Sequence, residues 1–105
     1  MSNNDGENKV YVYIDEDLVD LIPGYMANRK KDIETILKAL TKGDFEQIQL
    51  IGHSMKGNGS GYGFDQISEI GYVIEMAAKN KDKVAIEQQL RALEDYLNKV
   101  VVIYE

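Results

Sequence analysis

Residues 33–55 read IETILKALTKGDFEQIQLIGHSM, and this stretch predicts two helices joined by a tight turn. Apolar residues in its first half recur at steps of three and four, which is the spacing of one helix face. They are Ile33, Ile36, Leu37 and Leu40. Gly43 can end the first helix in a left-handed conformation, and Asp44 can then cap the second, with Gln47 completing a capping-box pattern. The second helix is expected over residues 45–58.

Comparable stripes predict further helices on both sides of this stretch. A short helix is expected from Asp15 to about Ile22, and Pro23 starts or kinks the longer helix that follows. Two more stripes come after the glycine-rich segment 57–63. They consist of Phe64, Ile67, Ile70, Ile74 and Ala77, and of Ile86, Leu90, Leu93, Leu97, Val100 and Tyr104. Residues 100–103 are β-branched and poor helix formers, but the stripe continues through them, so we expect them to be helical and frayed. The pattern predicts an all-α fold, an antiparallel four-helix bundle with a short additional N-terminal helix.

The N-terminal region divides into two parts. Residues 1–9 are polar and acidic, and they are predicted to form a disordered tail before a single domain over residues 10–105. Residues 10–14 alternate Val, Tyr, Val, Tyr and Ile, which alone is typical of a strand. Since no convincing partner strand lies nearby, we expect an extended lead-in that packs its apolar side on the bundle, and a helical conformation stays open.

Composition excludes several classes of function. The chain has 105 residues, enough for one domain, and no cysteine, which excludes disulfides, thiolate nucleophiles and cysteine-ligated metals. A formal net charge of −6 argues against a nucleic-acid binder. No apolar run reaches the roughly 18 residues of a membrane span, and the polar start is unlike a secretory signal, so we expect a soluble, cytoplasmic protein.

A single histidine cannot hold a metal or haem alone, and residues 57–63 lack the phosphate-binding G-x-x-x-x-G-K-[ST] order. We therefore expect no metal and no cofactor.

The chain's one histidine, His53, is the candidate for chemistry. On a helical wheel of about 100° per residue, the apolar stripe of the helix over residues 45–58 centres near 280° and His53 falls near 80°. The imidazole should therefore be exposed. Lys56 and Gly57 follow at i+3 and i+4, where side chains meet on a helix surface. An ammonium group and a position without a side chain thus flank the ring.

This combination suits phosphoryl transfer, which depends mainly on positioning and electrostatics. Lys56 can hold phosphoryl oxygens through charge-assisted hydrogen bonds, or it is only a solvated surface lysine. Gly57 would let a large partner approach. The second ring nitrogen needs an acceptor from an adjacent helix. Glu75, at the edge of the apolar stripe of its helix, is the candidate, although it can also be read as a simple rim carboxylate.

The motif around His53 resembles the signature of the histidine-containing phosphotransfer (HPt) domain family. Residues 53–57, followed by Gly63, read H-x-x-K-G-x5-G, and the likeness extends over roughly residues 10–105. The resemblance implies a helical bundle phosphorylated on the ring nitrogen far from the backbone, with Lys56 assisting the phosphoryl group and Glu75 bonding the other nitrogen. It also implies that Gly63 lies where helices come close, and that the protein has no kinase activity of its own.

The favoured hypothesis is a phosphorelay intermediate that carries a phosphoryl group on His53, with a histidine kinase and a response-regulator receiver domain as partners. Partner contacts are expected around the histidine, although Leu50 is equally well explained as an isolated surface leucine. These contacts are Gly57, Gln49, Leu50 and Ser60. Two alternatives stay open: a non-catalytic receiver-binding module, and the phosphoacceptor piece of a chemotaxis-type kinase. The polar tail and the final Glu105 favour a free-standing protein, for which a monomer is the default expectation.

Overall fold

The structure is a computed structural model that describes residues 8–105. Most of the tail predicted over residues 1–9 therefore lies outside the described residues. The elements, in chain order, are β1 (Val10–Ile14), the 3₁₀ helix η2 (Glu16–Leu18), α1 (Ile22–Lys42), α2 (Phe45–Gly59), the 3₁₀ helix η3 (Ser60–Tyr62), α3 (Asp65–Lys79), α4 (Lys83–Lys99) and β2 (Val100–Tyr104).

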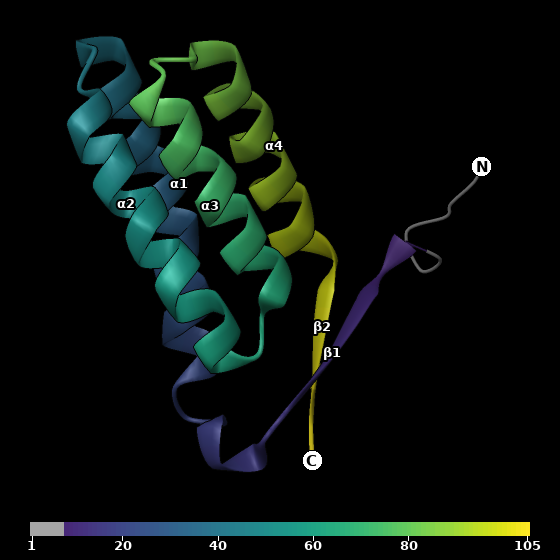
Figure 1. The fold of residues 1–105 in the computed structure, drawn as a ribbon. Coiled ribbons are helices and arrows are strands. Elements are labelled where there is room, and N and C mark those ends of the chain that lie inside the picture. Colours follow the sequence, from purple (N-terminus) through teal and green to yellow (C-terminus); the bar gives the residue numbers. More distant parts are fainter. Residues whose placement is uncertain (1–7) are drawn as a thin grey trace.

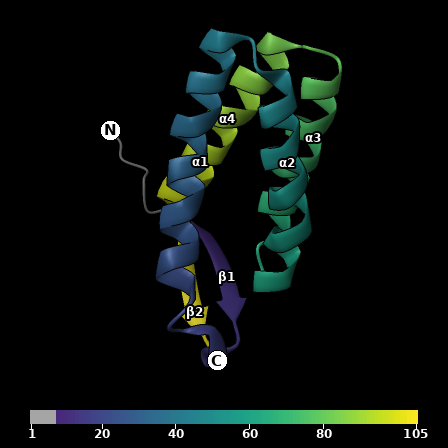
Figure 2. The same cartoon turned by 90° about the vertical axis from the view of Figure 1, so that its left-hand side faces the viewer.

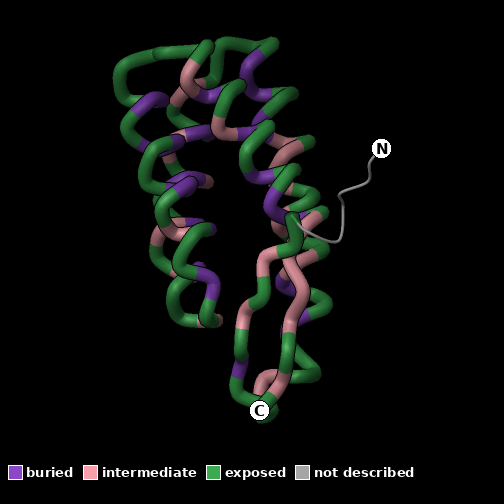
Figure 3. The backbone as a smooth tube through the Cα atoms, turned by 90° about the vertical axis from the view of Figure 1, so that its right-hand side faces the viewer, coloured by how far each residue is buried: buried purple, intermediate pink, exposed green. Residues whose placement is uncertain are grey.

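The four long helices form an up-and-down bundle, as Figures 1 and 2 show. α2 packs against α1 and α3, and α4 packs against the same two helices from the other side. Buried residues line the inward faces of the helices (Figure 3). The fully buried large side chains are Phe64, Ile36, Ile48, Met55, Ile67, Ile74, Ile86 and Leu93. The predicted all-α bundle is confirmed, with a small sheet added to it.

The helix ends are set by local capping. Gly43 has the left-handed φ of 69° and ends α1. The Asp44 side chain accepts a hydrogen bond from the backbone N–H of Gln47 at 3.1 Å and so caps α2, as the sequence predicts. Asp82 does the same for α4, accepting from Ala85 at 3.1 Å.

The prediction of a helix through residues 100–103 is wrong. α4 ends at Lys99, and Val100–Tyr104 forms β2, which pairs in parallel with β1 from Val10 opposite Val100 to Ile14 opposite Tyr104. β-branched residues favour strands, and the inward positions of the strand continue the apolar stripe of α4. The expected lead-in over residues 10–14 is thus a strand whose partner comes from the other end of the chain.

The short helix predicted from Asp15 to about Ile22 is also different in the structure. The Asp15 side chain caps it by accepting from the N–H of Asp17 at 2.9 Å, but only Glu16–Leu18 is helical, as a 3₁₀ turn. Backbone bonds from Leu18 to Asp15 and from Leu21 to Leu18 span three residues rather than four. A new helix, α1, then begins at Ile22 with a proline in its first turn, a position where the missing N–H costs nothing.

Candidate functional site

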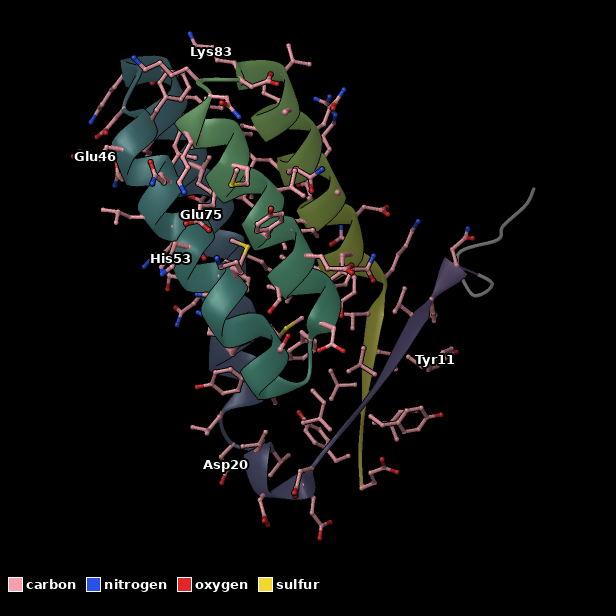
Figure 4. The ribbon with its side chains drawn as sticks, viewed as in Figure 1. Tyr11, Asp20, Glu46, His53, Glu75 and Lys83 are labelled. Atoms are coloured by element: carbon pink, nitrogen blue, oxygen red, sulfur yellow. The ribbon has the colours of Figure 1, made fainter. Side chains whose placement is uncertain are left out.

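His53 lies on the outward face of α2, and its side chain is 65% exposed (Figure 4). Ile48 and Met55, on the opposite face of the helix, are fully buried. The wheel therefore predicts the exposure of the ring correctly.

Glu75 connects His53 to Lys56. Its side chain comes from α3 and is only 9% exposed, so it is a buried carboxylate rather than a rim one. The Oε2 atom lies 3.0 Å from Nδ1 of His53, and the Oε1 atom lies 3.2 Å from Nζ of Lys56. One carboxylate thus bridges two side chains that stand one turn apart on α2.

The charge state of Glu75 fixes which ring nitrogen carries a proton. Burial alone raises the pKa of this carboxyl, but hydrogen bonds and charges from Lys56 and His53 outweigh it and hold the pKa below its usual value. The carboxylate is therefore ionised near neutral pH, and an ionised carboxylate can only accept hydrogen bonds. Nδ1 of His53 must then be the donor. In the neutral ring this leaves the lone pair on Nε2, the nitrogen away from Glu75.

A close crossing of α2 and α3 brings these groups within reach of one another. A Cβ added to Gly52 would lie 2.7 Å from the backbone nitrogen of Glu75, and one added to Gly71 would lie 2.5 Å from the backbone nitrogen of Lys56. Both glycines are buried. Sequence reasoning missed them, although a glycine inside a predicted helix costs about 1 kcal/mol relative to alanine and is a signal to look for close packing.

Three of the predicted partner contacts share one face of α2 with His53, and the fourth, Ser60, begins η3 directly after this helix. Gln49 and Leu50 precede the histidine by four and three residues, Gly57 follows at i+4, and Ser60 follows two turns on. Leu50 is 66% exposed, and a Cβ on Gly57 would meet nothing within 4 Å. Ser60 is less free, because its N–H donates to Oγ of Ser68 at 2.7 Å.

The family-model comparison matches an Hpt domain over residues 25–101, most of the chain. The chain belongs to the Hpt domain family. Searches of curated proteins and of solved structures give no match. Hpt domains are phosphocarrier modules of two-component systems, so this chain takes part in histidine-based phosphotransfer and signal transduction with two-component partners.

Gly63 has a different place in this Hpt domain from the one that the resemblance implies. It ends η3 with a left-handed φ of 97°, which favours glycine. A Cβ there would meet only the side chain of Ile14, at 3.5 Å. The close helix approach is made instead at Gly52 and Gly71, and at Gly59, where a Cβ would lie 2.6 Å from the backbone nitrogen of Ser68.

A polar network that the sequence did not predict joins α1 to the end of α2. The hydroxyl of Tyr25 donates to Oδ1 of Asn58 at 2.8 Å, and Nη1 of Arg29 donates to the same oxygen at 3.3 Å. The guanidinium also lies 4.5 Å from the Tyr25 ring centroid and pairs with Asp32 at 2.9 Å. This network holds α1 beside the site without reaching His53.

The described part of this Hpt domain carries neither a candidate metal site nor a helix that could span a membrane. In residues 8–105 no group of three His, Asp or Glu side chains is arranged to hold a metal ion. None of the helices there combines the length and the apolar character that a membrane-spanning segment needs.

Proposed function

We propose that this Hpt domain accepts a phosphoryl group on Nε2 of His53 and exchanges it with the aspartate of a response-regulator receiver domain. The observation that supports this most is the 3.0 Å contact between Nδ1 and the buried Glu75 carboxylate. It leaves Nε2 as the nucleophilic atom on a ring that is 65% exposed. A partner of domain size can therefore reach the reactive nitrogen.

The transfer step follows from this arrangement. The Nε2 lone pair attacks the phosphorus of the receiver's aspartyl phosphate, and the P–N bond forms as the P–O bond to the aspartate breaks. Nδ1 keeps its proton, so positive charge develops on the ring. Glu75 stabilises that charge through its ionised carboxylate at 3.0 Å. Transfer toward a receiver is the same path in reverse.

Lys56 and Gly57 would act on the phosphoryl group and on the partner. The Lys56 ammonium lies one turn from His53, and in the unphosphorylated protein it contacts Glu75 at 3.2 Å. A phosphoryl group on Nε2 offers it more negative charge, and charge-assisted bonds to phosphoryl oxygens are worth about 1.5–3 kcal/mol each. Gly57 leaves open space at i+4 for the receiver's own site.

The kinase chemistry is proposed to belong to a separate histidine kinase, with this protein as a phosphocarrier. A phosphotransfer assay tests the proposal. Incubated with a phosphorylated receiver, the wild type should gain a phosphate that is labile in acid and stable in base. His53→Gln should remain folded and gain none, and equal labelling of this variant would overturn the proposal.

The role of Lys56 has its own comparison. Lys56→Ala should slow transfer while leaving His53 modifiable, and Lys38→Ala, which removes an exposed lysine on α1, serves as the control. Equal rates for the two variants would make Lys56 an ordinary surface lysine. A wild type that binds the receiver but never labels would favour the non-catalytic interaction module.

A further inference from the structure

The small sheet presents an apolar face to solvent. Tyr11 pairs with Val101 and Tyr13 with Ile103, so these four side chains lie next to each other on the side of the sheet that faces away from the bundle. Tyr11 is 54% exposed, Tyr13 60% and Ile103 36%. Figure 3 shows the alternation along β1, and Figure 4 shows Tyr11 pointing away from the helices.

Nothing within the two strands protects this face or its edges. The ten residues of Val10–Ile14 and Val100–Tyr104 include no charge, no proline and no glycine. A sheet of two short strands is marginal alone, and natural proteins usually guard open edges with charges, prolines or bulges. An unguarded patch of tyrosine, valine and isoleucine is typical of a surface that another chain covers.

The charges around the sheet favour a second copy of this chain as the partner that covers its outer face. Lys9 and Lys99 directly precede the two strands, and Asp15 and Glu105 directly follow them. Because the strands are parallel, one end of the sheet is basic and the other is acidic. Asp95 pairs with Lys99 at 3.0 Å, so Lys9 supplies most of the positive charge. A twofold axis perpendicular to the strands exchanges the two ends and sets each against its opposite in an isologous dimer.

We propose that the outer face of the β1–β2 sheet packs against the same face of a second copy, with the two sheets antiparallel. Five-residue strands are only about 17 Å long, so the interface is smaller than the roughly 800 Å² per partner of a stable complex. The dimer is therefore weak, with a dissociation constant in the range of about 1 μM to 1 mM. Tyr11 and His53 lie on opposite sides of the molecule in Figure 4, so both histidines of the dimer stay open.

Sedimentation of the full chain over a series of concentrations tests the dimer. The wild type should change from monomer to dimer, and Tyr11→Ser with Tyr13→Ser should raise the dissociation constant at least about tenfold. Val84→Ser removes a side chain that is 62% exposed on α4, away from the sheet, and should leave association unchanged. Far-UV circular dichroism checks that all three fold. A wild type that is monomeric at about 1 mM would overturn the proposal and assign the face to a different partner.

A charge exchange tests the antiparallel arrangement without touching the tyrosines. Lys9→Asp and Glu105→Lys should each weaken association, because each sets like charges against one another across the dimer. The double variant keeps the net charge of the wild type and should recover most of the association. Weakening in the single variants without recovery in the double would rule out the antiparallel arrangement.

Discussion

Gly52 and Gly71 meet backbone to backbone where α2 crosses α3. A Cβ on Gly71 would lie 2.8 Å from the carbonyl oxygen of Gly52, and one on Gly52 would lie 2.9 Å from the carbonyl oxygen of Gly71. Gly52 directly precedes His53, and Gly71 lies one turn before Glu75. The distance between the buried carboxylate and the imidazole therefore depends on two positions that carry no side chain.

Gly71→Ala is expected to push α2 and α3 apart. Overpacking of this kind costs typically about 1–3 kcal/mol, and here it should also lengthen the contact between His53 and Glu75. Urea unfolding measures the first effect, and ¹⁵N NMR of the His53 ring measures the second as a loss of the preference for a proton on Nδ1. Gly24→Ala is the control, since a Cβ there meets nothing within 4 Å. If Gly71→Ala is destabilised but keeps its proton on Nδ1, the close packing of α2 and α3 does not control the contact between His53 and Glu75.

Gly57→Ala should have opposite effects on stability and on transfer. The added methyl group meets no atom within 4 Å, and alanine is the better helix former by up to about 1 kcal/mol. The free energy of unfolding should rise accordingly. Phosphotransfer from a receiver should slow, because the methyl group fills the open space beside His53. A variant that is more stable and equally fast would show that the receiver does not need that space.

Features encoded within a few residues could be predicted from the sequence. Gly43, Asp44 and Asp82 set the ends of helices through their own conformation or side-chain bonds, so they are recognisable without the fold. The outward position of His53 follows from the period of one helix. The identity of Glu75 as the nearest carboxylate needed only the edge of a neighbouring helix.

Features that join distant segments could not be predicted in this way. β2 pairs with a strand at the other end of the chain, and its inward residues happen to extend the stripe of α4, so a local analysis favoured the helix. The contact between Gly52 and Gly71 depends on the register of two helices, which no single stripe determines. The family resemblance pointed to Gly63 as the close helix approach, whereas the tight contacts lie at Gly52, Gly59 and Gly71.

Asn58→Ala should destabilise the packing of α1 on α2. One side-chain oxygen of Asn58 accepts from Tyr25 at 2.8 Å and from Arg29 at 3.3 Å, and its loss leaves both partly buried donors without that acceptor. The expected cost is about 1–3 kcal/mol by denaturant unfolding. Asn28→Ala, at an exposed position of α1, is the control and should change stability by less than about 0.5 kcal/mol. Equal effects would show that the network contributes nothing measurable.

The two isoleucines of the sheet provide a matched test of how it packs. Ile14 is 2% exposed and belongs to the core, whereas Ile103 is 36% exposed on the outer face. Ile14→Ala should cost about 2–5 kcal/mol, and Ile103→Ala should cost far less when unfolding is measured in dilute protein, where dimers do not contribute. If Ile14→Ala were as mild as Ile103→Ala, the strands would not be docked on the bundle.

Glu75 should make the stability of the bundle depend on pH. Its pKa in the folded protein lies below the ordinary value of 4.5, despite burial, because Lys56 and His53 favour the ionised form. The unfolded chain therefore binds this proton more readily, so the carboxylate stabilises the fold above the ordinary pKa. That contribution is lost as the pH falls through the lower, folded-state pKa.

Glu75→Gln should be less stable than the wild type near neutral pH, and the difference should shrink in acid. Glu69→Gln, an exposed glutamate on the same helix, is the control in thermal unfolding at each pH. A Glu75→Gln deficit that stayed constant between neutral and acidic pH would mean that the ionised carboxylate is not what holds Lys56 and His53.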